Sequence, residues 1–181
     1  LGFSPLPGAE VEAERIAALF PGQRGKLLRG KDGDLASIVL QSAAHDVLHL
    51  ATHGVARGDD PLASFVLLAP SNCGELLTAR RVMTLSLKAD LVALRACQTG
   101  LGRVAGEGVL GLSRAFLFAG ARSVLVSHWS VSDQATTTLM TGFYERYLGQ
   151  RLDKARALQL SMDALRRQRG FEHPRYWAPF F

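Results

Sequence analysis

Residues 89–100 read Ala-Asp-Leu-Val-Ala-Leu-Arg-Ala-Cys-Gln-Thr-Gly, and this stretch decides the fold. Its first part, residues 89–95, is a short apolar run of the kind that forms a strand buried on both faces of a parallel sheet. Cys97 follows this predicted strand directly, and Gly100 closes the stretch. A strand end is rigid and a glycine-bearing turn is open to a ligand, so the pattern presents a thiol at a fixed place.

A second stretch repeats this arrangement with a histidine. Residues 46–51 form another apolar run, and Thr52, His53 and Gly54 follow it. The two stretches together offer an imidazole and a thiol, which is the pair that a cysteine peptidase requires.

Further apolar runs and helical patterns alternate along the chain. We expect strands at 65–69 and 123–128, and helices at 9–20, 34–43, 107–119, 133–148 and 152–168. This alternation predicts an α/β fold with a mostly parallel sheet and helices on both faces. In such sheets the functional site lies outside the carboxyl ends of the strands. His53 and Cys97 would therefore meet at one edge if their strands are neighbours.

Several local features refine these elements. Asp34 is a plausible N-cap, and the helix at 133–148 begins at Ser132 or Asp133. The helix at 107–119 is apolar nearly all round, so it should be buried, and Gly120 should end it. An aromatic and methionine stripe at 139–147 is expected in the core, and residues 54–64 are expected to form an exposed loop.

The composition is that of an ordinary soluble domain. The chain has 181 residues, of which 48% are hydrophobic and 20% charged, and it contains two cysteines. No apolar run is long enough to span a membrane, no secretion signal is visible, and so few cysteines suit a reducing cytoplasm. The first and last residues look like the interior of a longer protein, so we expect an excised domain.

The net charge of +5 raises nucleic acid as a partner. The basic residues between 151 and 169 have the spacing of a solvated helix face, and no aromatic residues are interleaved with them as stacking platforms. Nucleic acid is therefore an unlikely partner.

Cofactor and metal sites find little support in the sequence. Residues 106–111 match a dinucleotide-binding fingerprint by spacing, but they do not directly follow a strand, and Glu107 would face the phosphate. We expect instead a helix start packed close to the sheet. The histidines and cysteines lack the paired spacing of zinc ligands. The expectation is therefore no cofactor and no metal.

The residues after the two strands suggest a reaction. His53 could take the proton of Cys97, because only the thiolate attacks a carbonyl, and could return it to the leaving amine. The backbone N–H groups of Gly54 and Cys97 are candidate oxyanion donors, typically worth ~3 kcal/mol each. A side chain at position 54 would crowd the incoming carbonyl.

Several separated motifs resemble the CHAT domains, caspase-like peptidases related to separase. The matching stretches are residues 49–54, 89–102, 106–108, 115–121, 127–133 and 173–178. This resemblance implies a caspase-haemoglobinase three-layer sandwich and a His53–Cys97 dyad. Caspases place the histidine about 50 residues before the cysteine, and here the two residues are 44 positions apart.

The resemblance also implies residues that contact the substrate. Arg95, two residues before the cysteine, and Asp133 occupy positions that line the substrate pocket in related peptidases. A free Asp133 would favour basic substrate residues, a dominant Arg95 acidic ones, and a pair of the two a nearly neutral pocket. The expectation is a basic residue. Trp129 either walls this pocket or packs in the core.

The sequence thus predicts one CHAT domain over residues 1–181, a cytoplasmic protein of bacterial source. Its expected function is a cysteine endopeptidase that cleaves a protein or peptide substrate, governed by a regulatory or sensor domain elsewhere in the parent protein. The alternative is a catalytically silent adaptor that uses the fold only for protein interaction.

Overall fold

A computed structural model describes residues 6–20, 25–71, 75–95 and 106–181, with the side chains of 106–110 left out. Cys97, Cys73 and Gly100 lie outside the described residues. The chain divides into two compact units. One, here called the helical unit, is Leu1–Leu27 with Val131–Phe181, and the other, the sheet unit, is Leu28–Ser130.

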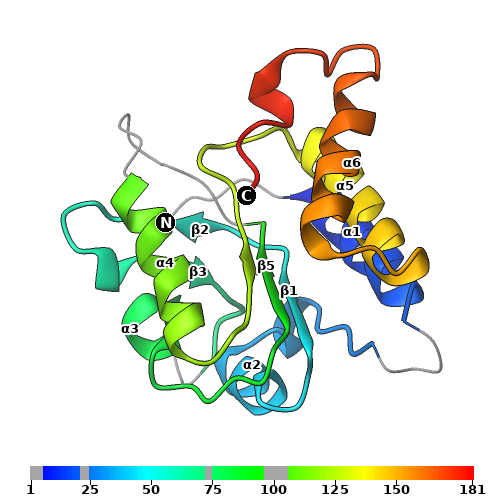
Figure 1. Cartoon of the computed structure of the whole chain (residues 1–181). Coiled ribbons are helices and arrows are strands. Elements are labelled where there is room, and N and C mark those ends of the chain that lie inside the picture. Colours follow the sequence, from blue (N-terminus) through cyan, green and yellow to red (C-terminus); the bar gives the residue numbers. More distant parts are fainter. Residues whose placement is uncertain (1–5, 21–24, 72–74, 96–105) are drawn as a thin grey trace. The chain divides into compact units, whose positions relative to one another are not determined.

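A parallel sheet lies in the sheet unit. Strands β1 (Val47–Leu50), β5 (Leu91–Leu94) and β6 (Val124–Leu125) pair in the order β1-β5-β6, and both pairings are parallel. Figure 1 shows β1 and β5 side by side. All four residues of β5 are buried, as a strand covered on both faces requires. The predictions of strands at 46–51, 89–95 and 123–128 are confirmed, although the observed strands are shorter.

A second sheet in the same unit is antiparallel. It consists of β2 (Gly54–Val55), β3 (Phe65–Leu67) and β4 (Leu76–Thr78), in the order β2-β3-β4. The strand at 65–69 was expected in one mostly parallel sheet, and residues 54–64 were expected to form an exposed loop. Both expectations were wrong in this respect, because β2 and β4 are too short to give a pattern of alternating residues.

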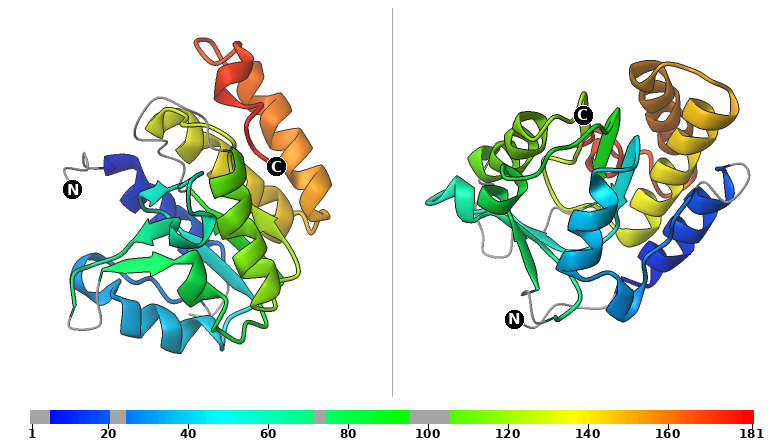
Figure 2. Two further views of the ribbon diagram at one scale, coloured as in Figure 1. Left: turned by 90° about the vertical axis from the view of Figure 1, so that its left-hand side faces the viewer. Right: turned by 90° about the horizontal axis from the view of Figure 1, so that it is seen from below.

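Helices α2 (Leu35–Ser42), α3 (Ala79–Val82) and α4 (Gly106–Phe118) complete the sheet unit, with 3-10 turns η2 (Gly30–Asp32) and η3 (Pro61–Ala63). The predicted cap is confirmed, since Asp34 Oδ1 accepts a hydrogen bond from the Ser37 N–H at 2.8 Å. Side chains from all three helices and from strands of both sheets form one hydrophobic core. Figure 2 shows the α2 and α4 ribbons beside these strands.

The last turn of α4 departs from the expectation of a helix buried all round. Leu112, Ala115 and Phe116 are buried in the core, whereas Phe118 is 71% exposed and Leu117 46%. Gly120 ends the helix as predicted, with φ +111°. A Cβ at this position would meet the carbonyl oxygen of Leu87, so both the backbone angle and the space require glycine.

The helical unit contains α1 (Pro7–Ala18), α5 (Asp133–Tyr144), a π-helical turn η4 (Glu145–Gly149), α6 (Lys154–Arg166) and the 3-10 turn η5 (Pro174–Tyr176). Helix α5 packs against α1 and against α6, and Figure 2 (right) shows the three side by side. The expected core stripe is confirmed for Leu139, Met140, Phe143 and Tyr144, all nearly inaccessible. Burial, with the nearby Glu12 charge, raises the pKa of Tyr144.

Candidate functional site

The carboxyl ends of β1, β5 and β6 lie at one edge of the parallel sheet, here called the carboxyl edge. In the β1–β5 pair Val47 lies opposite Leu91 and Leu50 opposite Leu94, a constant offset of 44 residues. The Arg95 N–H donates to the Leu50 carbonyl at 3.0 Å and continues this pairing to the last described residue before Cys97. His53 and Cys97 are themselves 44 residues apart, so each follows its strand at the same distance.

The segment that carries His53 is held by β3. The Leu67 N–H donates to the His53 carbonyl at 2.7 Å, and the Thr52 hydroxyl donates to the Leu67 carbonyl, also at 2.7 Å. One residue of β3, Leu67, therefore holds Thr52 through its side chain and His53 through its backbone carbonyl. The role of Thr52 was missed in the sequence analysis, since a lone threonine after a strand carries no distinguishing signal.

The backbone N–H of Gly54 is directed away from β3. Residues in an antiparallel pair alternate between positions that exchange hydrogen bonds and positions that do not. The Leu67 N–H donates to the His53 carbonyl, so His53 and Leu67 form a hydrogen-bonded pair. The next pair along the ladder, Gly54 and Val66, therefore does not exchange hydrogen bonds. The β2–β3 ladder therefore does not use the Gly54 N–H, which is the group that the sequence analysis nominated as an oxyanion donor.

Two of the predicted substrate-contacting residues also follow strands at the carboxyl edge. Arg95 comes directly after β5 and is only 9% exposed. Trp129 lies four residues after Leu125, the last residue of β6, and is partly buried. The order of the parallel strands thus brings His53, Gly54, Arg95 and Trp129 into segments that leave the same edge.

Asp133 belongs to the other unit. It is the first residue of α5, behind the Ser132 cap, and its carboxylate accepts a hydrogen bond from the Gly8 N–H at 2.7 Å. The Thr137 hydroxyl donates to the Gly8 carbonyl at 3.3 Å. A Cβ at residue 8 would meet the Asp133 carboxylate and would lie 2.7 Å from Thr137 Oγ1, so glycine at this position lets the start of α1 come close to these side chains of α5. Within the helical unit, Asp133 therefore fixes α1 on α5.

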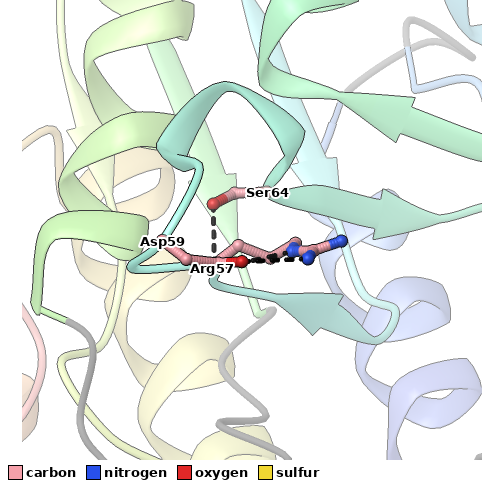
Figure 3. Close-up of polar contacts among 3 residues, drawn as sticks. All are labelled: Arg57, Asp59 and Ser64. Carbon is pink, nitrogen blue, oxygen red and sulfur yellow. Dashed lines mark hydrogen bonds and ion pairs between the residues drawn. The ribbon is translucent and has the colours of Figure 1, made fainter.

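The connection from β2 to β3, residues 56–64, carries polar contacts that the sequence analysis did not predict (Figure 3). The guanidinium of Arg57 bonds to the Asp59 carboxylate, with Nη2 at 3.1 Å from Oδ2. This bond raises the pKa of Arg57 and lowers the pKa of Asp59. The side chains are 49% and 72% exposed, so the pair contributes little to stability.

Ser64, the last residue of the same connection, makes a buried hydrogen bond. Its hydroxyl oxygen accepts a hydrogen bond from the Arg57 N–H at 2.9 Å (Figure 3), and the residue is fully buried. The expectation of an exposed loop at 54–64 is thus wrong at both ends, where Gly54 and Ser64 are buried.

Helix α4 approaches the same connection. A Cβ at Gly111 would lie 2.7 Å from the carbonyl oxygen of Pro61 and 2.9 Å from its Cβ. The glycines at 106–111 were expected to pack the helix start close to the sheet. The structure shows a close approach at Gly111, against η3, and this contact gives one glycine of the motif a physical reason.

The described ranges contain neither a candidate metal site nor a candidate membrane span. Within them, no group of three or more histidine, cysteine, aspartate or glutamate side chains could hold a metal ion. None of the helices described combines the length and the hydropathy that a bilayer span demands.

Comparison with known proteins identifies the family of the chain. The model of the CHAT domain family matches residues 1–181. Tetratricopeptide repeat protein 28 of Homo sapiens is 40% identical over 105 residues, which are 58% of this chain and 4% of that protein. The Mus musculus protein of the same name is 38% identical over 105 residues, with the same coverage. The chain thus spans about 4% of the length of these curated relatives. Both are mammalian, and the bacterial source stays a prediction.

Proposed function

Because the chain belongs to the CHAT domain family, a family of caspase-like peptidases, we propose that it is a cysteine endopeptidase with His53 and Cys97 as its dyad. The observation that carries the proposal is the register of β1 and β5. Parallel strands paired at a constant offset of 44 residues end at the same edge, and in the sequence residues 53 and 97 each come three residues after the end of their strand. This supports a shared site.

The proposed reaction begins with proton transfer. His53 accepts the proton of the Cys97 thiol, and the thiolate attacks the carbonyl carbon of the scissile peptide bond. The oxyanion that forms accepts hydrogen bonds from the Gly54 and Cys97 N–H groups. Loss of one such donor typically costs about 100-fold to 1,000-fold in kcat. The ladder geometry at Gly54 supports this role, since β3 does not use its N–H.

The reaction then completes in two steps. His53 returns the proton to the leaving amine, which breaks the peptide bond and leaves an acyl group on the Cys97 sulfur. Water, deprotonated by His53, attacks this thioester and releases the acid product and the thiolate. His53 acts as base, acid and base again. No group beyond these side chains, two backbone N–H donors and water takes part.

We propose a basic residue at the cleavage position of the substrate. Arg95 is almost fully buried, whereas Asp133 is partly exposed. The Asp133 carboxylate already accepts a hydrogen bond from the Gly8 N–H, but a carboxylate has several lone pairs and can also accept from a basic group of the substrate. In this proposal Asp133 receives the basic group of the substrate, and Arg95 and Trp129 are the other residues that contact the substrate.

We further propose that residues 1–181 act as one caspase-haemoglobinase-like domain, a three-layer sandwich that belongs to a longer cytoplasmic protein. The α/β architecture with its parallel sheet supports this fold. The relatives are named for tetratricopeptide repeats, and the matched segment is a small part of them. This supports regulation by a further segment of the parent protein or by a protein partner.

Cleavage profiling tests the proposal. The full chain, Cys97→Ala and the matched control Cys73→Ala are each incubated with a peptide library, and new termini are identified by mass spectrometry. We expect the wild-type chain and Cys73→Ala to cleave the same bonds, enriched after lysine and arginine, and Cys97→Ala to cleave none of them. Identical product patterns from all three proteins would refute the peptidase and leave the adaptor.

A further inference from the structure

Ser64 is a buried polar residue for which the proposed reaction has no role. It is 0% exposed, and its backbone N–H, its carbonyl and its hydroxyl oxygen each make a hydrogen bond. The hydroxyl oxygen accepts from the Arg57 N–H at 2.9 Å. The Ser64 carbonyl accepts from the Ala79 N–H at 2.7 Å, and the Ser64 N–H donates to the Pro61 carbonyl at 3.3 Å. Ser64 thus joins the connection that leaves β2, the η3 turn and the first residue of α3.

This position matters because β2 is very short. The strand contains only Gly54 and Val55, and so short a strand has little stability of its own. Before the strand, Leu67 bonds to His53 and Thr52. After the strand, the bond from the Arg57 N–H to Ser64 holds the chain. The segment that carries His53 and Gly54 is therefore fixed on both sides, and Ser64 supplies the second anchor.

Both anchors are attached to the same rigid element. Ser64 directly precedes Phe65, the first residue of β3, and Leu67 is the last. Strand β3 pairs with β4 as well as with β2, and Phe65 and Val66 are buried in the sheet unit. The position of His53 and Gly54 is thus set from β3 through residues 64 and 67.

We propose that Ser64 is a positioning residue for His53 and Gly54, acting through the backbone of the β2 segment. The proposal rests on the proposed function, since it assigns Ser64 a role in the same site. Without the hydroxyl, the Arg57 N–H loses its acceptor, and the chain that follows the Val55–Phe65 pair is no longer held to residue 64. The imidazole then samples positions from which it stabilises the thiolate less well.

The rate of alkylation by iodoacetamide, measured against pH, tests this role directly. The rate follows the thiolate fraction of the cysteine, so it reports how well His53 is placed. A change of stability alone would not move this profile. The variants are built on Cys73→Ala, so that Cys97 is the single remaining cysteine of the chain.

We expect the parent to have an apparent pKa below the ordinary thiol value of about 8.5. His53→Ala should move the profile up to that value and slow alkylation at pH 7 about 10-fold or more. The pH profile of Ser64→Ala should lie between those of the parent and His53→Ala, and its alkylation at pH 7 should be about 3-fold to 10-fold slower than that of the parent. The matched control Ser42→Ala removes another buried serine hydroxyl of the same unit, one that donates within α2, and should reproduce the parent profile.

Circular dichroism identifies which variants are folded. Should Ser64→Ala fail to fold, Arg57→Pro removes the same hydrogen bond from the donor side, with Arg57→Ala as the control that keeps the N–H. A profile of the folded variant that superimposes on the parent, while His53→Ala differs, would overturn the role of Ser64 and leave the dyad standing. A His53→Ala profile identical to the parent would instead refute the dyad, and this inference with it.

Discussion

Gly54 combines two properties that only the sequence and the structure together reveal. The sequence places it directly after His53, where a side chain would crowd a substrate. The structure adds the direction of its N–H, because the Leu67–His53 bond sets the alternation of the β2–β3 ladder. That direction depends on the register of a partner strand, and no local pattern in residues 52–55 encodes it.

Ser64 could not have been singled out in the sequence. A serine before a strand is ordinary, and its importance comes from contacts with Arg57, Pro61 and Ala79, which the chain reaches only after folding. Helix caps differ in this respect. Asp34 and Ser132 bond to N–H groups three residues ahead, so both were predictable from the local sequence.

The cap at Asp34 predicts a pH dependence of stability. The backbone N–H of Ser37, with the Ser37 side chain, donates to the carboxylate and lowers the pKa of Asp34 below 3.8. As the pH falls, the unfolded chain therefore takes up this proton first. The stabilisation is complete above the unfolded pKa and is lost as the pH falls through the folded pKa.

Asp34→Asn isolates this effect, because asparagine caps a helix without titrating. Urea unfolding of both proteins is measured between about pH 6 and about pH 2. The free energy of unfolding of the wild-type chain, relative to the variant, should decrease towards the acid end. A difference that does not change with pH would show that the carboxylate charge makes no contribution.

At the scale of elements, the contact between α4 and η3 gives a second prediction. A Cβ at Gly111 would contact the backbone of Pro61, which cannot turn aside as a flexible side chain can. We expect Gly111→Ala to lower the free energy of unfolding by about 1–3 kcal/mol, the usual cost of overpacking. Urea unfolding followed by circular dichroism measures the change.

Gly33→Ala is the matched control for Gly111→Ala. Its new Cβ would find no atom nearer than 3.5 Å, and its backbone does not have a positive φ. The free energy of unfolding of Gly33→Ala should stay within about 0.5 kcal/mol of that of the wild-type chain. Equal losses from the two substitutions would mean that α4 and η3 are free to separate.

Elements were predictable where the chain gives a long periodic signal. The helices at 133–148 and 152–168 and the three parallel strands were found near their observed places. Strands β2 and β4 and the single turn of α3 were missed, because each consists of so few residues that tertiary pairing decides its conformation. The exposure of Phe118 was also missed, because an apolar sequence does not show which side chains of a helix other elements will cover.

At the scale of the whole molecule, each unit contains one of the two tryptophans. Trp129 belongs to the sheet unit and Trp177 to the helical unit. Ile16, which is 4% exposed, lies on α1 and packs within the helical unit, and Leu35, 1% exposed, lies in the core of the sheet unit. Single-tryptophan variants can therefore report on each unit separately.

We predict that Ile16→Ala destabilises the transition reported by Trp177 by about 2–5 kcal/mol, and destabilises the transition reported by Trp129 less. Leu35→Ala should do the reverse. Fluorescence during urea unfolding, in Trp129→Phe and Trp177→Phe backgrounds, measures both. Transitions that move together in all four proteins would mean that the units unfold as one cooperative body.

The parallel pairing of β1 with β5 has a consequence for how the chain tolerates insertions and deletions. The loops between Gly54 and Leu91 could gain or lose length without altering which positions of β1 and β5 face each other. Adding a single residue between Leu50 and His53, in contrast, would displace the imidazole alone. The number of residues between the histidine and the cysteine can therefore vary in evolution. The number of residues between each of them and the end of its own strand cannot.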